Sequence, residues 1–285
     1  MKLTPGEKAF FAIVALSSLW VGAWAYIEPA LVQNGIPWSV PQFHARLIGA
    51  AYLSAFVFCV MSASARSYAE VRIVLSMIAI WTLVLLIVTP FYLTLDDYDR
   101  EPIWIWLGAL VIYLVIAPWV MFVHQGFYAD PGAAPPMWAR LYFLLQALIL
   151  IAGAVLLLAL PGVMIRIWPW DLTPQLARIH AAPVLCFGVA SFQLARVRRY
   201  REIRIPVAGM LVFAVAVLVA SAIHREMFAS GSPAMIAWFA GFAIAALILA
   251  FLFVQSGRKS AAPAAPPVSD QAELALEPSG DSQPR

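Results

Sequence analysis

The sequence predicts an all-α protein: a polytopic membrane helix bundle with eight transmembrane helices arranged as two parallel four-helix repeats. Three observations carry this prediction: an excess of apolar residues, their grouping into long blocks, and a constant offset between similar segments. Of the 285 residues, 63% are hydrophobic and 12% are charged, whereas soluble domains carry about 25% charged residues. The blocks are roughly 20 residues long, which as helices span a ~30 Å hydrocarbon core.

The apolar blocks are expected to be helices. Inside a bilayer, backbone groups must pair within their own segment or in a closed barrel, and the alternating pattern of barrel strands is absent. The predicted spans are residues 9–28, 43–63, 72–94, 102–123, 138–160, 177–196, 204–223 and 234–255.

The first block has two interpretations. Basic residues, an apolar run and the segment Ala23-Trp24-Ala25 are typical of a cleavable signal peptide. The length of the run, the bulky Trp20 and Trp24, and a counterpart later in the chain favour a retained helix.

The distribution of Lys and Arg predicts the orientation in the membrane. Basic residues concentrate on the side of the N-terminus, and loops rich in Lys and Arg are cytoplasmic. Both termini are therefore expected in the cytoplasm. The basic residues sit at helix ends, so the net charge of +3 does not indicate a nucleic-acid partner. The N-terminal side receives Lys2, Lys8, Arg66, Arg72, Arg140, Arg196, Arg198, Arg199, Arg201, Arg204, Arg258 and Lys259, and the other side only Arg46, Arg100, Arg166, Arg178 and Arg225.

Similar segments of the two halves are separated by a constant difference in residue number, as from 64 to 196 and from 46 to 178, and this difference is called the repeat offset here. Without a gap, the segment SARSYAEVRI (64–73) aligns with RVRRYREIRI (196–205), and the same offset pairs Arg46 with Arg178. One single-residue slip is needed around His44. We expect residues 1–123 to form a first transmembrane repeat, 124–137 a cytoplasmic connector, 138–255 a second repeat, and the Pro/Ala-rich residues 256–285 a disordered cytoplasmic tail.

Four helices per repeat is an even number, so each copy returns to its starting side. The copies then share one orientation and are related by an axis along the membrane normal. Arg46 and Arg178 are thus expected at the same outer face. The charged clusters around Glu70 and Glu202 are expected in the cytoplasm, where ion pairs would clamp each hairpin.

Arg46 and Arg178 each lie about one turn inside a predicted helix, next to small residues that let helices approach closely. One interpretation is anchoring, in which the guanidinium reaches the headgroups, holds a loop carbonyl, or pairs with Glu28 or Asp171. The other is an anion site near the pseudo-twofold axis, because a guanidinium suits carboxylate or phosphate. The candidate ligand-binding residues are Arg46, Arg178, Glu28, Asp171, Trp38 and Trp170.

Histidines on the predicted outer side raise a third interpretation. Two His and a carboxylate hold a transition metal in many proteins, and a facing His pair holds haem. No HxxxH or HExxH spacing is present, so these histidines are expected to lie at the membrane interface and to bond to water, and no metal and no cofactor is expected. The weak metal candidates are His44, His180 and His224.

Catalytic motifs are also missing. The sequence contains no Gly-x-Ser-x-Gly and no Walker-type glycine loop, and no catalytic residue is assigned.

The motifs PWSVP…AR (37–46) and PWDLTP…AR (169–178) resemble those of a group of uncharacterised bacterial multi-pass inner-membrane proteins. The likeness covers both halves and excludes the tail. It implies residence in the bacterial inner membrane and carries over no activity.

We expect a protein that binds or transports a small anionic solute or lipid headgroup at its outer face, with membrane lipids as further partners. The alternatives are a non-catalytic membrane subunit or scaffold and a metal- or haem-dependent membrane enzyme.

Overall fold

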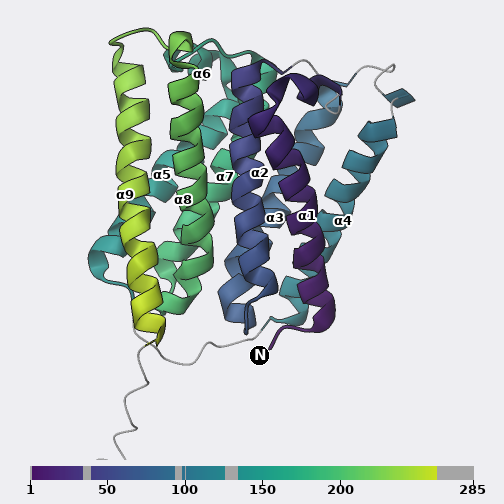
Figure 1. The fold of residues 1–285 in the computed structure, drawn as a ribbon, viewed down its shortest axis with the longest axis vertical. Helices are drawn as coiled ribbons and strands as arrows, with labels where there is room; N and C mark the ends of the chain where they lie inside the picture. The colour runs from purple at the N-terminus through teal and green to yellow at the C-terminus, as the bar shows by residue number, and fades with distance from the viewer. Residues whose placement is uncertain (1, 35–39, 94–97, 100, 126–133, 262–285) are drawn as a thin grey trace, which may run out of the picture.

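The computed structural model describes residues 2–34, 40–93, 98–99, 101–125 and 134–261. In this part of the chain eight helices are long and apolar enough to cross a membrane, and they lie side by side in a bundle (Figure 1). The chain is a multi-pass membrane protein, as predicted. The helices are α1 (Pro5–Ile27), α2 (Gln42–Ala63), α3 (Tyr68–Val88), α4 (Glu101–Val123), α5 (Met137–Ala159), α7 (Pro174–Arg196), α8 (Tyr200–Ile223) and α9 (Pro233–Ala261).

Two differences from the predicted elements concern short segments. A seven-residue helix, α6 (Pro161–Ile167), follows α5 directly; its apolar sequence was merged with the loop in the prediction. Helix α9 continues to Ala261, into the segment expected to be a tail, and residues 262–285 lie outside the described part.

Local sequence explains where two of the long helices begin. Thr4 and Glu7 form a capping box at α1, with the Thr4 amide donating to Glu7 Oε2 at 2.7 Å and Pro5 in the first turn. Thr173 caps α7, where its Oγ1 accepts from the Leu176 amide at 3.2 Å. Such caps satisfy amides that have no partner inside the helix.

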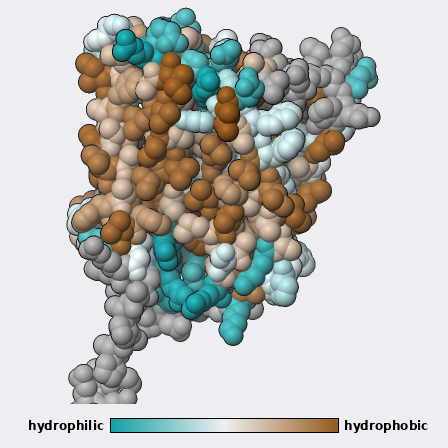
Figure 2. Space-filling view, viewed as in Figure 1, coloured by the Kyte–Doolittle hydropathy of each residue, from teal (hydrophilic) through white to brown (hydrophobic). Residues whose placement is uncertain are grey.

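The inner helices of the bundle are α2, α3, α7 and α8. At least 50% of each of these spans is buried, against 39% for α1 and 22% or less for α4, α5 and α9. The outer helices expose large apolar side chains such as Leu16, Ile105 and Leu148. Figure 2 shows the resulting apolar band across the middle of the molecule, with hydrophilic residues at both ends. A surface of this kind is stable only when lipid covers it.

Helix packing has a two-fold pattern. Helix α1 packs on α2 as α5 packs on α7; α3 packs on α4 as α8 packs on α9; and α2 contacts α8 as α3 contacts α7. Hydrogen bonds repeat in the same way. Ser54 Oγ donates to the Gly209 carbonyl at 2.8 Å, and Cys186 Sγ donates to the Met77 carbonyl at 3.5 Å. The two donors are separated by the repeat offset, and so are the two acceptors.

The end of the bundle that carries the N-terminus and the end of α9 is called the proximal end here, and the opposite end the distal end (Figure 1). At the proximal end, Arg72 binds the buried carboxylate of Glu202 with a 2.6 Å contact, and Arg201 approaches Glu70 at 3.4 Å. These ion pairs join the two hairpins. The expectation that pairs form within each hairpin was wrong, because α3 and α8 contact each other and bring opposite charges of the two hairpins together.

Candidate functional site

Arg46 lies near the start of α2 at the distal end. Its Nε donates to the Tyr26 carbonyl in the last turn of α1 at 3.2 Å, and its Nη1 hydrogen-bonds to Nε2 of His224, the residue that ends α8. The guanidinium thereby ties together three helices. Both acceptors are uncharged when His224 is neutral.

Arg178 occupies an equivalent setting in the other half. Its Nε donates to the Leu158 carbonyl of α5 at 3.3 Å, and its Nη1 donates to the hydroxyl of Tyr92 after α3. The repeat offset pairs Tyr26 with Leu158, and it pairs Tyr92 with His224. Each arginine therefore holds a carbonyl of its own half and a side chain of the other half.

The two guanidinium charges lack a carboxylate partner among the residues that the structure describes. Glu28 and Asp171 are exposed, and the ion pairs found in the described part involve neither Arg46 nor Arg178. Each arginine holds a carbonyl as anticipated from sequence, but the carbonyl belongs to the last turn of a helix and not to a loop. The anticipated pairing with Glu28 or Asp171 is not found among the described residues. An unpaired, partly buried cation is expensive in a poorly solvated environment.

Arg46 and Arg178 share no hydrogen-bond partner in the described part of the chain, and the surroundings of the two residues are called the arginine corners. The contact between α2 and α7 is made instead by His44 and His180, whose Nδ1 and Nε2 atoms are 2.8 Å apart. Both imidazoles are buried, and their rings stack with centroids 5.1 Å apart. Asp171, a predicted ligand residue, places its backbone within hydrogen-bonding reach of His44.

The two nitrogens of the histidine pair are closer together than two axial haem ligands are. Metal–nitrogen bonds of about 2 Å require two axial ligand nitrogens to be about 4 Å apart, and these nitrogens are in direct hydrogen-bonding contact. His224 is engaged with Arg46 rather than with the pair. In the described residues no group of three His, Cys, Asp or Glu side chains has an arrangement suited to a metal ion.

Aromatic side chains cover this end of the bundle. Trp170 packs edge-on against Phe43 and Trp238, with centroid distances of 4.8 and 4.7 Å. The indole nitrogens of Trp168 and Trp170 are buried and have no hydrogen-bond acceptor in the described part of the chain. A buried N–H without a partner is rare in native proteins. The remaining predicted residue, Trp38, lies outside the described residues.

His224 is the titratable member of the Arg46 corner. Because its Nε2 accepts from Arg46, the neutral ring carries its proton on Nδ1, which faces Glu226 Oε1 at 3.5 Å. Burial and the Arg46 charge lower the pKa of His224 below its ordinary value, while Glu226 acts in the opposite direction.

The lowered pKa of His224 predicts a pH-dependent stability. The folded protein favours the neutral ring, so this contribution is constant above about pH 6.5, the unfolded value, and stability falls as the pH drops below it. We expect the melting temperature of the wild type to fall progressively, relative to that of His224→Gln, as the pH is lowered from about 6.5 to about 5. A constant difference across this range would contradict the assignment.

Comparison of the chain with protein-family models, curated proteins and solved structures finds no match.

Proposed function

We propose that this integral membrane protein binds a small anionic solute or an anionic lipid headgroup at Arg46 and Arg178, at the outer face of the bacterial inner membrane. The excess of Lys and Arg at the proximal end supports the orientation, and the resemblance of the Pro-Trp motifs supports the compartment. The two arginine corners belong to a four-helix unit that occurs twice in the chain.

The observation that carries the proposal is that two guanidinium groups, in equivalent settings, bind only uncharged partners among the described residues. Each arginine has five N–H donors, and the described contacts use Nε and Nη1. The Nη2 groups are therefore left for a ligand. Phosphate and carboxylate match the planar fork of a guanidinium in shape and in charge.

The unpartnered indole N–H groups of Trp168 and Trp170 give a second line of support. They are donors, as the arginines are, and they lie at the same end of the bundle. A ligand rich in acceptors satisfies both kinds of group.

Thermal unfolding of the purified protein tests the proposal. We expect phosphate to raise the melting temperature relative to chloride at equal ionic strength, because a ligand at ten times its Kd stabilises the folded state by about 1.4 kcal/mol. Arg46→Gln and Arg178→Gln should each reduce the shift, and the double variant should abolish it. Glycerol 3-phosphate and nanodiscs containing phosphatidylglycerol distinguish a free solute from a lipid headgroup.

The matched control is Arg166→Gln, which removes an exposed charge at the same end and should leave the shift unchanged. The Arg46 and Arg178 contacts to carbonyls also support a purely structural, scaffolding role. A phosphate shift that survives in the double variant would favour that role and overturn the binding proposal.

A further inference from the structure

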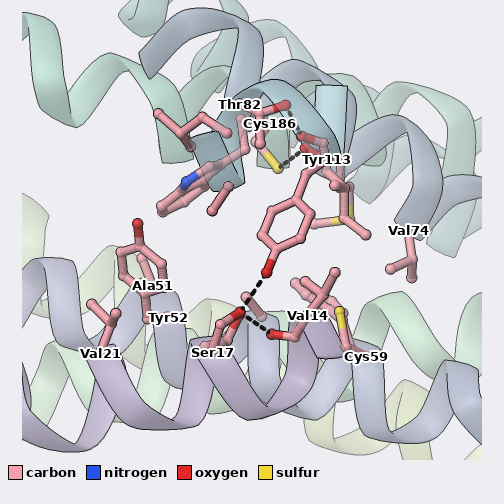
Figure 3. A pocket seen from close by; sticks show the side chains of 18 of the residues that line it. Val14, Ser17, Val21, Ala51, Tyr52, Cys59, Val74, Thr82, Tyr113 and Cys186 are labelled. Atoms are coloured by element: carbon pink, nitrogen blue, oxygen red, sulfur yellow. Dashed lines mark hydrogen bonds between the residues drawn. The ribbon is translucent and has the colours of Figure 1, made fainter. Parts of the chain in front are cut away.

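A cavity of about 110 Å³ lies within the membrane-spanning part of the bundle, between α1, α2, α3 and α4 of the first half and next to α7 of the second half (Figure 3). Its walls are mostly apolar and include Val14, Ala51, Met77, Leu110 and Phe187. Its size is comparable to the ~150 Å³ apolar cavity that takes up benzene. This cavity is distinct from the arginine corners of the proposed function.

Two tyrosine hydroxyls enter the cavity with different hydrogen-bonding roles. The Tyr52 ring packs edge-on against Trp81 with centroids 5.5 Å apart, and both residues line the cavity together with Trp106. An indole can only donate a hydrogen bond, so neither tryptophan accepts the proton of the Tyr52 hydroxyl. The Tyr113 hydroxyl is 2.9 Å from Ser17 Oγ, and the two groups lie close together on the cavity wall in Figure 3.

A second contact of Ser17 shows which hydroxyl is the donor in its hydrogen bond with Tyr113. Its hydroxyl donates to the Val14 carbonyl at 3.0 Å, so Tyr113 is the donor in the pair with Ser17. Helices α1 and α4 pack mainly on α2 and α3 respectively, and this pair links them across the cavity. Tyr52 is a cavity hydroxyl for which no hydrogen-bond acceptor is found among the described residues.

The second half of the chain is an internal control for these polar groups. At the positions that the repeat offset pairs with four polar residues of the cavity wall, the second half has small or aliphatic side chains. These are Ile149 for Ser17, Val184 for Tyr52, Ala214 for Thr82 and Ala245 for Tyr113. The second half has Phe242 at the position of Leu110.

Aromatic rings pack together in the corresponding region of the second half. Phe213 packs against Phe187 and Phe242 with centroid distances of 4.6 and 6.1 Å, and Phe242 packs against Trp238 at 4.6 Å. The bundle can therefore be built with apolar side chains at these positions. The hydroxyls of the first half are not required by the packing of the helices.

We propose that the cavity binds a membrane-dissolved molecule with an apolar body and a carbonyl oxygen that accepts the Tyr52 proton. A ring carrying a carbonyl, as in a quinone, fits both the size of the cavity and the donor. The rest of such a molecule extends into the lipid beside α1 and α4, whose outer faces carry exposed apolar side chains.

Binding of decylubiquinone to the full chain in nanodiscs tests this inference, with quenching of tryptophan fluorescence as the readout. Tyr52→Phe keeps the ring and removes the donor, so the Kd should rise about tenfold, the effect of one hydrogen bond. Leu110→Phe introduces the residue that the second half has at this position and should abolish binding by filling the cavity. Tyr142→Phe, at a half-buried tyrosine of α5 outside the cavity, should leave the Kd unchanged.

Decylbenzene, which has the same tail and no carbonyl, separates the roles of the ring and the oxygen. We expect it to bind at least tenfold more weakly than decylubiquinone. Equal binding of the two compounds, or a Tyr52→Phe variant with the wild-type Kd, would overturn the proposal. If Leu110→Phe fails to fold, the Tyr52→Phe and decylbenzene comparisons decide the question.

Discussion

Gly49→Ala is expected to destabilise the bundle by about 2–3 kcal/mol, as overpacking of a tight core does. A Cβ atom at Gly49 would lie 2.7 Å from the Tyr26 backbone nitrogen and 3.0 Å from the Ala25 carbonyl carbon. Backbone atoms cannot turn aside as a flexible side chain can, so α1 must move away from α2. Because Tyr26 also supplies the carbonyl for Arg46, the same shift weakens that corner.

Gly108→Ala in α4 is the matched control for this substitution. It adds the same methyl group to a helix at a position with no atom within 4 Å. It should leave stability unchanged or raise it slightly, because Ala favours the helix more than Gly does. Reversible unfolding in mixed micelles measures both variants, and equal stability of the two would contradict the tight α1–α2 contact.

Replacement of one buried histidine is expected to be much more harmful than replacement of both. His44→Leu or His180→Leu leaves the other ring without its partner, and each should destabilise the protein by about 1–3 kcal/mol. The double variant removes both polar groups, so we expect it to be markedly more stable than the sum of the single effects implies. Single effects that simply add would contradict the direct His44–His180 hydrogen bond.

The sequence was sufficient to predict the membrane bundle. Blocks of about 20 apolar residues have few alternatives to a spanning helix, and the predicted ends differ from the observed ones by a few residues. Helix α6 was missed because a segment of seven mostly apolar residues next to a longer apolar block gives no separate signal.

The surroundings of the two arginines were only partly predictable. The repeat offset pairs Tyr92 with His224, which was a usable signal for the two equivalent partners of Arg178 and Arg46. The carbonyls of Tyr26 and Leu158 carry no side-chain signal. The repeat offset does not pair His44 with His180, because one histidine precedes its arginine by two residues and the other follows by two, so the direct hydrogen bond between them was not predicted.

The cavity was also invisible from sequence. Ser17, Tyr52 and Tyr113 lie on three different helices, and isolated polar residues in apolar blocks are more often explained by packing between helices. Their common location depends on how α1 and α4 are placed around α2 and α3, which is a property of the assembled bundle.

The most direct test of the proposed function is a calorimetric titration of the purified protein with inorganic phosphate. The two equivalent arginine corners predict two bound phosphates per chain, one in each single variant Arg46→Gln and Arg178→Gln, and none in the double variant. Phosphate binding with the wild-type stoichiometry in the double variant, or no binding to the wild type, would contradict the account.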